Sequence, residues 1–360
     1  MRDIIADRIA REGPIRFADF MAAALYDPEH GYYMRETARE TDYFTSVTAH
    51  PVFAEMLARH LDDVWEALGR PDPFVVVEMA SGDGELARSL IRLAPEHPWA
   101  SSLEYVGVET SPARRRAADR LTGSRFVASL SEVKRGAAAA VLSNELFDAL
   151  PFDLARRSGS GWVEEQVGLD GDSFAFADAP ATDAILAYGE RYGTRVPQGG
   201  RIEVRRGVRQ LYADLDRLAD RVSIITIDYG NIAELVHCER LSAGTAMSFR
   251  AHRGSEDLLA RPGEQDLTCH VNFSELADVG ECFGFKAAPL VQQADFLASL
   301  GIGEYLVYLQ SSPGMTEGRY SRERESIMRL VSPSDLGRFK VLAQSRGVDM
   351  EGLRGIPAGS

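Results

Sequence analysis

One segment constrains the fold of this chain more than any other: an apolar run followed at once by a glycine-containing loop and a helical pattern. The run, residues 74–77, is Phe-Val-Val-Val, which is typical of a strand buried on both faces of a sheet. The loop at 78–84 reads Glu-Met-Ala-Ser-Gly-Asp-Gly, and the apolar spacing over 86–93 then fits a helix. Strand, tight turn and helix in this order predict an α/β unit.

The same alternation continues along the chain. Further strand patterns occupy residues 105–108, 125–127, 137–142 and 222–227, and a helical pattern fills residues 112–121. Parallel strands that alternate with helices are joined by right-handed crossovers. We therefore predict an α/β protein with a Rossmann-like, mostly parallel sheet.

The remaining segments predict additions around this core. Helical patterns near the N-terminus and the polar, aromatic loop after them predict a lid over the ligand site, and an Asp170-Gly171 turn between two strand patterns predicts an inserted β-hairpin. Ser332-Pro333 resembles the start of a helix that Gly347 would close. The expected domains are an N-terminal helical lid at 1–70, the first part of the core at 71–151, a hairpin and substrate region at 152–207, the continued core at 208–230, a second substrate insertion at 231–270, and the C-terminal part of the core with helices at 271–360.

Composition narrows the expected partners and compartment. Forty Lys and Arg residues stand against 54 Asp and Glu residues, a formal net charge of −14, and no basic run suits a phosphate backbone. We therefore expect no nucleic-acid partner, and no membrane partner because the longest apolar run, residues 137–142, is too short to cross a bilayer. Three cysteines without CxxC spacing and the acidic residues near the N-terminus predict a cytoplasmic protein without a metal site. A homodimer is compatible with the sequence.

The loop at 78–84 is the sharpest local signal for a ligand. Gly82 and Gly84 allow the backbone to approach a ligand closely, and the helix that starts near Glu85 points free N–H groups at it, which suits an anionic group. Gly82, Gly84 and Ala87 also match the GxGxxA pattern of dinucleotide-binding proteins. The candidate ligands are a dinucleotide and S-adenosylmethionine (SAM), which would present its carboxylate. The alternative is a tight strand-to-helix turn that binds no ligand.

Three further strand ends extend this site. Glu109 ends the second strand, where a carboxylate can accept hydrogen bonds from ribose hydroxyls, and Ser129 and Leu130 follow the third strand, where they are candidates for contact with an adenine ring. After the fourth strand comes Asn144-Glu145-Leu146-Phe147-Asp148-Ala149-Leu150-Pro151. Class I methyltransferases commonly carry a short polar motif with proline at this place, whereas a nicotinamide enzyme has no need of one. SAM is therefore favoured over a nicotinamide cofactor.

With these motifs the chain resembles the MidA-like methyltransferases, a class I family related to the mitochondrial complex I assembly factor that methylates a protein arginine. The resemblance runs nearly end to end. It rests on Gly13-Pro14-Ile15, Asp27-Pro28 with Gly31-Tyr32-Tyr33, Asp42-Tyr43-Phe44-Thr45-Ser46, the loop at 78–84, Asn144-Glu145 with Asp148-Ala149-Leu150-Pro151, Asp228-Tyr229-Gly230, Pro262-Gly263-Glu264-Gln265-Asp266, His270-Val271 and Phe339-Lys340-Val341-Leu342-Ala343.

The resemblance implies a class I methyltransferase fold, SAM as the cofactor and a set of contacts to it. The residues expected to bind SAM are Thr45, Ser46, Glu78, Ala80, Ser81, Gly82, Gly84, Leu86, Glu109, Thr110, Ser129, Leu130, Asn144 and Glu145.

The catalytic residues depend on the methyl acceptor. A guanidinium acceptor has a high pKa and calls for a nearby carboxylate, for which Asp148, Glu145 and Asp228 are the candidates. For a hydroxyl or amine of a small metabolite, His270 or His252 could act as the base. Asp148, Asp228 and His270 are the catalytic residues that we expect.

Several positions depart from the family pattern and bear on the acceptor. Ala80-Ser81 stands where the family usually has Gly-Pro, and Ser46-Val47-Thr48 where it has Ser-Pro-Glu. Ala246-Met247 replaces Leu-Arg, Asn231 an aromatic residue and Asn272 an aspartate. Because charged residues are lost from the expected substrate loops, we predict methyl transfer to an N or O atom of a specialised small molecule or modified peptide. The alternatives are a protein arginine acceptor, and a SAM-binding assembly factor with little catalysis.

Overall fold

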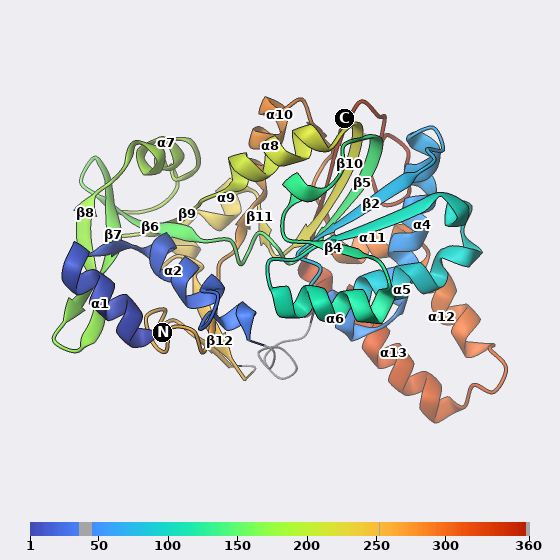
Figure 1. Cartoon of the computed structure of the whole chain (residues 1–360), viewed down its shortest axis with the longest axis horizontal. Helices are drawn as coiled ribbons and strands as arrows, with labels where there is room; N and C mark the ends of the chain where they lie inside the picture. The colour runs from blue at the N-terminus through green and yellow to red at the C-terminus, as the bar shows by residue number, and fades with distance from the viewer. Residues whose placement is uncertain (36–44, 252, 358–360) are drawn as a thin grey trace. The chain divides into compact units, whose positions relative to one another are not determined.

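The computed structural model of the chain describes residues 1–35, 45–251 and 253–357 (Figure 1). They form two compact units, each made of several chain segments. Unit 1 comprises the described residues of Met1–Tyr43, Phe147–Gln210 and Gly230–Leu276, and unit 2 those of Phe44–Leu146, Leu211–Tyr229 and Ala277–Ser360. The finer division into six segments that the sequence suggests stays a prediction.

Unit 2 is built on an eight-stranded sheet in the order β16-β18-β10-β5-β2-β3-β4, with β17 paired to β18. The five strands that the sequence predicts are all present and run parallel to their neighbours among them, so the mostly parallel α/β fold is confirmed. They are β2 (Phe74–Met79), β3 (Leu103–Val108), β4 (Arg125–Val127), β5 (Gly136–Asn144) and β10 (Ala219–Asp228). The antiparallel strands are β16 (Lys286–Ala287), β17 (Val291–Gln292) and β18 (Lys340–Arg346).

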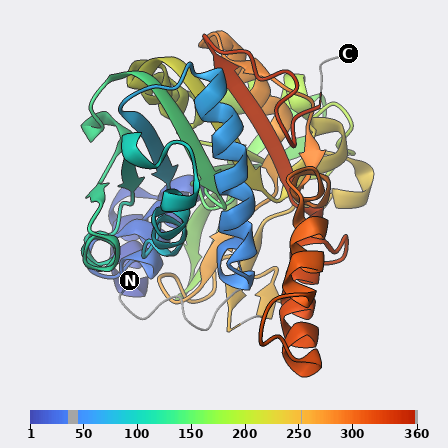
Figure 2. The same ribbon diagram turned by 90° about the vertical axis from the view of Figure 1, so that its right-hand side faces the viewer.

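Helices cover this sheet through a shared hydrophobic core. Figure 2 shows α4 (Val52–Ala67) lying along one face of the sheet, and the apolar side of α4 packs with Val76 of β2, Leu142 of β5 and Phe296 of α11. The other helices of the unit are α3 (Ser46–Ala49), α5 (Glu85–Leu93), α6 (Pro112–Thr122), α11 (Gln293–Ser299), α12 (Ile302–Gln310) and α13 (Glu317–Val331), with short 3-10 turns at Ala94–Glu96, Ala100–Ser102, Leu130–Glu132 and Leu336–Arg338. Helices α8 (Val208–Leu218) and α10 (Phe273–Cys282) span the sequence boundaries between the units.

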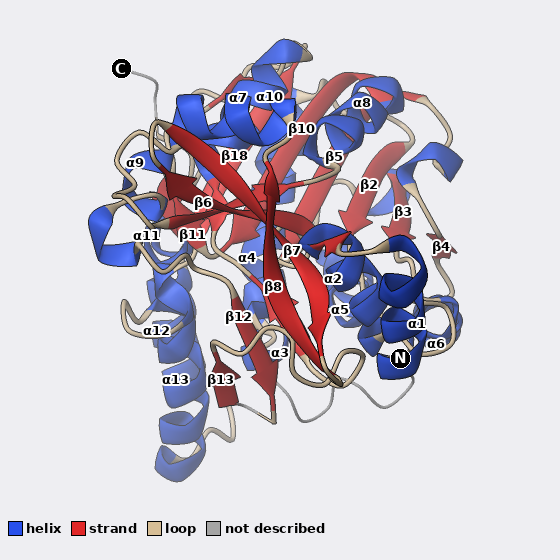
Figure 3. Cartoon of the chain, turned by 90° about the vertical axis from the view of Figure 1, so that its left-hand side faces the viewer, coloured by secondary structure: helices blue, strands red, loops and turns tan. Residues whose placement is uncertain are grey.

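Unit 1 is built on an antiparallel sheet in the order β1-β7-β6-β9, with β8 paired to β7. The predicted hairpin of β7 and β8 is present, with Val163 opposite Pro180 and Asp170 opposite Ser173 (Figure 3). Gly171 has the left-handed conformation that this turn needs. The strands are β1 (Ile15–Arg16), β6 (Phe152–Ser158), β7 (Gly161–Asp170), β8 (Ser173–Pro180) and β9 (Arg201–Arg205). Smaller sheets hold β11 (Gly230–Asn231), β12 (Met247–Arg250), β13 (Arg253–Ser255), β14 (Asp266–Thr268) and β15 (Val271–Asn272).

The N-terminal helices belong to the core of unit 1. Phe17 and Phe20 of α2 are fully buried, and the Phe17 ring lies 5.3 Å from that of Phe152 on β6. The helices of this unit are α1 (Arg2–Glu12), α2 (Phe17–Tyr26), α7 (Asp183–Tyr192) and α9 (Ala233–Val236), with 3-10 turns at Tyr32–Met34 and Glu239–Leu241. Residues 36–44, which include most of the loop expected to close the lid, lie outside the described residues, so the lid stays a prediction.

The helix expected after Ser332-Pro333 is wrong. That segment forms a 3-10 turn, Leu336–Arg338, and then the strand β18, which ends one residue before Gly347. Strand β18 pairs with β10 so that Arg346 lies opposite Val222 and Lys340 opposite Asp228. Val341 and Ala343 are buried in the core. Burial of the continuous run from Val341 to Ser345 against the sheet therefore outweighs the local capping pattern. None of the described helices is long and apolar enough to cross a membrane.

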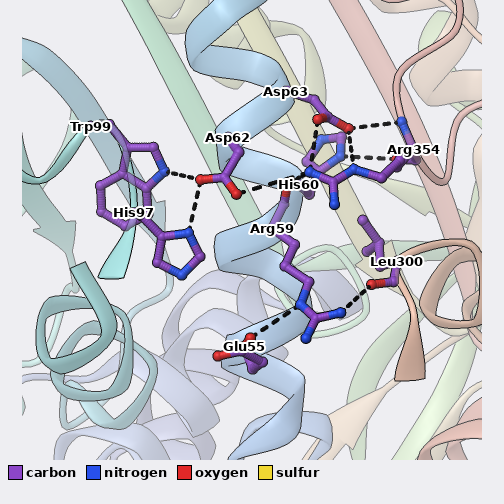
Figure 4. A network of polar contacts seen from close by, with 9 residues as sticks. All are labelled: Glu55, Arg59, His60, Asp62, Asp63, His97, Trp99, Leu300 and Arg354. Atoms are coloured by element: carbon purple, nitrogen blue, oxygen red, sulfur yellow. Dashed lines mark hydrogen bonds and ion pairs between the residues drawn. The ribbon is translucent and has the colours of Figure 1, made fainter. Parts of the chain in front are cut away.

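A polar network fastens the C-terminal segment to α4 (Figure 4). Arg354 donates from Nε and Nη2 to the two oxygens of Asp63 at 2.9 and 2.8 Å, and from Nη2 to the Arg59 carbonyl. Beside them His60 is completely buried, with Nδ1 3.3 Å from the Arg354 carbonyl oxygen, so Nδ1 carries the proton. Burial lowers the pKa of His60 from 6.5 to about 4.

This histidine makes the stability of unit 2 depend on pH. Its pKa is lower in the folded chain than in the unfolded one, so its contribution is complete above pH 6.5 and is lost as the pH falls through about 4. We predict that moving from pH 7.5 to pH 4.5 removes roughly 2 to 3 kcal/mol through this group. His60→Gln, which can still donate to Arg354, should flatten the dependence in urea unfolding curves. His30→Gln, on the turn after α2, is the control, and an unchanged pH slope in His60→Gln would contradict the prediction.

Candidate functional site

The loop after β2 turns sharply because three of its residues are left-handed. Ala80, Gly82 and Gly84 have φ values of 54°, 56° and 85°. The Ser81 N–H donates to the Val108 carbonyl of β3, and α5 begins directly after Gly84. A Cβ on Gly84 would lie 2.8 Å from the Cβ of Ala118 in α6, so only glycine fits there.

The loop lies at the point where the order of the strands reverses. From β2 the chain continues to β3 and β4 on one side and to β5 and β10 on the other. In open α/β sheets, ligands bind outside the carboxyl ends of the strands at such a reversal. The carboxyl ends of β2, β3 and β5 are therefore the candidate site.

Glu109, directly after β3, ties two of these turns together. Its Oε2 accepts from the Gly82 N–H at 3.0 Å and its Oε1 from the Ser111 N–H at 2.8 Å, with Thr110 Oγ1 3.5 Å away. A carboxylate has about four lone-pair positions, so two amide donors leave capacity for ribose hydroxyls. The structure thus adds to the expected ribose contact a second role, the positioning of the glycine loop.

Other residues expected to bind the cofactor surround these turns in different ways. Glu78 is buried in β2 and accepts a 2.6 Å hydrogen bond from Tyr105, whose pKa is raised by burial and by this carboxylate. The Leu86 side chain is packed in the hydrophobic core rather than exposed at the loop. Ser129 precedes the turn that begins at Leu130, after β4, and its hydroxyl lies 2.7 Å from that of Ser131.

The end of β5 carries a second left-handed residue that is not glycine. Glu145 has a φ of 52°, and its N–H donates to the Ile227 carbonyl of β10. Its Oε1 accepts from Asn144 Nδ2 at 3.1 Å and from the Ser46 N–H at 3.3 Å. Strain of this kind persists where the surrounding contacts enforce it, and it is concentrated at functional sites.

Buried polar atoms at this edge call for a ligand. Within the described part of the chain, Ser81 Oγ, Ser143 Oγ and Asn144 Oδ1 are buried and have no hydrogen-bond partner. They lie at the ends of β2 and β5, two paired strands. Buried polar groups are rarely left without a partner, so these three atoms fit contacts to a polar molecule.

Thr45 and Ser46 introduce the short helix α3. Thr45 and Thr48 form a capping box, each accepting the other's backbone N–H through its side-chain oxygen. Thr48 therefore does by itself what glutamate does at this position of a capping box, which explains one departure from the family pattern without reference to the acceptor. Ser46 is fully buried, and its hydroxyl donates to Gln293.

The expected catalytic residues fall in both units. Asp228 ends β10 in unit 2, is fully buried and accepts from its own neighbour, the Tyr229 N–H, at 2.8 Å. Asp148 and His270 belong to unit 1, where the Cys269 N–H donates to the Asp148 carbonyl at 3.2 Å. His252, the other histidine considered, lies outside the described residues.

A buried arginine that the sequence did not predict joins the residue before Asp148 to His270. Arg205 of β9 donates from Nε to the Phe147 carbonyl at 2.7 Å, and from Nη2 to the Cys269 and His270 carbonyls at 2.8 and 2.5 Å. Charge-assisted hydrogen bonds of this kind fix backbone geometry strongly. Arg205 and Gln293 are each one polar residue in an ordinary strand or helix start, so no local pattern could have revealed them.

Comparison with known proteins identifies the family. The model of a family described as S-adenosyl-L-methionine-dependent methyltransferases matches residues 56–291. The chain belongs to this family of methyltransferases. It is 28% identical to the mitochondrial protein arginine methyltransferase NDUFAF7 homolog of Drosophila melanogaster, over 95% of this chain and 84% of that protein, and 25% identical to NDUFAF7 of Danio rerio, over 86% and 78%. A crystal structure of a COG1565 superfamily member from Burkholderia thailandensis, bound to S-adenosyl-homocysteine (SAH), has a TM-score of 0.84 and 28% identity, covering 98% of this chain and 93% of that one.

These comparisons confirm the MidA-like resemblance, the class I methyltransferase fold, the enzymatic activity and SAM as the cofactor. They leave the nicotinamide cofactor without support. They also contradict the cytoplasmic location that we expected, because the Drosophila and zebrafish relatives are mitochondrial proteins by name. Cysteine spacing is a weak guide to location, because cysteines are reduced both in the cytoplasm and in the mitochondrial matrix. A few acidic residues near the N-terminus are an equally weak guide.

Substitution of Glu109 tests the cofactor site of the methyltransferase directly. We predict that Glu109→Ala weakens SAH binding roughly 10- to 100-fold, because the charged carboxylate loses ribose hydroxyls and releases the Gly82 N–H, together about 1.5–3 kcal/mol. Isothermal titration calorimetry measures the change. Glu104→Ala, an exposed glutamate near the amino end of the same strand, is the matched control. A folded Glu109→Ala protein with the dissociation constant of the unchanged protein would remove Glu109 from the site.

The methyltransferase also stores strain at Ala80. An alanine Cβ is disfavoured in the left-handed region, so Ala80→Gly should stabilise the chain by roughly 0.5–1 kcal/mol in urea unfolding. Ala87→Gly, in the helix α5 that follows, should destabilise by at least that amount, because helical backbone disfavours glycine and the fully buried methyl group is lost. Equal destabilisation by the two substitutions would show that Ala80 is unstrained.

Proposed function

We propose that this methyltransferase transfers the methyl group of SAM to a side-chain nitrogen of a protein, and that the acceptor is an arginine guanidinium. The observation that carries the proposal is a pair of carboxylates at the edge where the cofactor is expected. Strands β5 and β10 are parallel with Asn144 opposite Ile227, so Glu145 and Asp228 directly follow paired residues on neighbouring strands. Two acidic residues at neighbouring strand ends suit a cationic acceptor.

The chemistry needs little beyond binding and proton removal. SAM, when bound, supplies a methyl group on a positively charged sulfur. The turns around Gly82, Glu109 and Asn144 would hold the cofactor, with the three buried polar atoms at the ends of β2 and β5 as further contacts. A guanidinium has a pKa above 12, so a carboxylate must hold it in place and take the proton that leaves as the nitrogen gains its methyl group. Asp228, at the end of β10 in unit 2, is the proposed proton acceptor, and the catalytic roles of Asp148 and His270 in unit 1 stay predictions.

Two further facts support a protein acceptor. The relatives from Drosophila and zebrafish, which match most of the chain, are protein arginine methyltransferases by name. The formal net charge of −14 favours encounter with a cationic partner over an acidic one.

A specialised small molecule is the second candidate acceptor. Ala246 and Met247 are neutral where the family usually has Leu-Arg, which favours a less charged acceptor. However, Ala246 packs against the hydrophobic core of unit 1 and its backbone N–H donates to Glu203 Oε1 at 3.0 Å, and Thr48 is explained by the capping box. The neutral residues therefore carry less weight than their number suggests.

One experiment separates the two acceptors. The enzyme is incubated with tritiated SAM and an extract of cells that lack it, divided into protein and small-molecule fractions. We predict label in the protein fraction, recovered as methylarginine after hydrolysis, and transfer to an arginine peptide that falls at least 100-fold when lysine replaces the arginine.

The variant Asp228→Asn tests the proton acceptor. It should lower kcat by about 100-fold or more because a carboxamide cannot take the proton, while SAH binding stays within about threefold. Asp220→Asn, an exposed residue near the amino end of the same strand, should leave kcat unchanged. Label confined to the small-molecule fraction would overturn the arginine proposal in favour of the second candidate.

A further inference from the structure

The start of helix α3 is held by side chains from distant parts of unit 2. The Ser46 N–H donates to Glu145 Oε1 at 3.3 Å, and Ser46 Oγ donates to Gln293 Oε1 at 2.9 Å. Gln293, at the start of α11, is fully buried, and its Nε2 donates to the Leu330 carbonyl of α13 at 3.0 Å. A continuous chain of hydrogen bonds therefore runs from α13 through Gln293 and Ser46 to the carboxyl end of β5.

The chain of hydrogen bonds ends at the amide of Asn144. Asn144 Nδ2 donates to the same oxygen of Glu145 that Ser46 reaches, so the Glu145 carboxylate determines how this amide is turned. Asn144 Oδ1 is thereby left as the free acceptor: it is buried and has no donor among residues 1–35, 45–251 and 253–357. A donor from a ligand would satisfy it, and SAM carries N–H groups on both its amino-acid and adenine ends.

We infer that Gln293 is a positioning residue for the cofactor site: it holds Ser46, which with Asn144 holds Glu145 and so presents Asn144 Oδ1 to SAM. The inference rests on the proposed location of SAM at the carboxyl ends of β2, β3 and β5. Gln293 acts through Ser46, because its own contacts are to Ser46, the Leu330 carbonyl and, through its backbone N–H, the Phe339 carbonyl.

A second contact from α13 holds the other end of α3. His50, directly after α3, has Nε2 3.0 Å from Glu323 Oε2 on α13, while its Nδ1 accepts from the Val52 N–H at 2.9 Å. Both ends of α3 are thus connected to α13. The start is connected through Gln293, which is bonded to Leu330, and the end directly through His50 and Glu323. A four-residue helix has little stability of its own, so its position depends on these contacts.

The test compares two glutamines that are equally buried. Gln293→Met keeps the length of the side chain but removes the acceptor for Ser46. Gln344→Met is the matched control: Gln344 is also fully buried in unit 2 and hydrogen-bonded to Tyr212, but it lies opposite Ile224 in the middle of β10. We expect Gln293→Met to raise the SAH dissociation constant and the KM for SAM about tenfold with kcat within threefold, and Gln344→Met to change neither by more than twofold, at a similar loss of Tm.

A second variant establishes the route. Ser46→Ala should weaken SAH binding as Gln293→Met does. The double variant should bind SAH no more weakly than either single variant, because both substitutions remove the same hydrogen bond between Ser46 and Gln293. A folded Gln293→Met protein with normal SAH affinity, additive effects, or an equal loss of affinity in Gln344→Met would overturn the inference. Normal SAH affinity in Glu109→Ala would overturn the cofactor site itself, and with it the role of Gln293. Weaker SAH binding in Glu109→Ala together with normal binding in Gln293→Met would overturn only the role of Gln293.

Discussion

The hydrogen bonds that Glu109 accepts from the Gly82 and Ser111 N–H groups are the interaction on which the candidate site depends. They join the turn after β2 to the turn after β3, and the Ser81 N–H adds a bond to the Val108 carbonyl of β3. Parallel strands carry no hairpin that would fix the relative height of their ends. A buried carboxylate that accepts from both turns supplies that constraint, and the start of α5 then lies against the middle of α6, where Gly84 leaves just enough room for Ala118.

The same edge uses left-handed residues at two strand ends, Ala80 just after β2 and Glu145 just after β5. A left-handed residue turns the chain sharply, and at these two turns the N–H groups of Ser81 and Glu145 donate to carbonyls of the neighbouring strands β3 and β10. Glycine would do this without strain, yet Glu145 gains something that glycine lacks. Its carboxylate reaches back to Asn144 and across to Ser46, so the strained residue also organises its neighbours.

The parts of the fold that the sequence predicts are those with a local physical cause. The apolar runs of β2, β5 and β10 have to be buried on both faces, and the Asp170-Gly171 turn can close a hairpin without help from the rest of the chain. Strand β18 was missed because Ser332-Pro333 resembles a helix cap, while the pairing of β18 along β10 depends on residues more than a hundred positions away. Glu109 and Asn144 stand out in the sequence because Glu109 follows a strand and Asn144 ends one. Gln293 and Arg205 do not, because their partners are assembled only by the fold.

The two units divide the candidate catalytic groups in a way that bears on specificity. Unit 2 contains the cofactor turns and the carboxylates of Glu145 and Asp228, all fixed by the register of one sheet. Unit 1 contains Asp148 and His270, whose chain segments are joined by the Cys269 N–H, which donates to the Asp148 carbonyl, and by the Arg205 guanidinium, which donates to the Phe147 and His270 carbonyls. Positions fixed by sheet register tolerate little change, whereas segments held by a few hydrogen bonds can shift when a neighbouring residue is substituted. The departures from the family pattern at Asn231, Ala246, Met247 and Asn272 fall in unit 1, whereas those at Thr48, Ala80 and Ser81 fall in unit 2, so they are spread over both units. In unit 2 they bear on local backbone geometry, because Thr48 completes a capping box and Ala80 is left-handed.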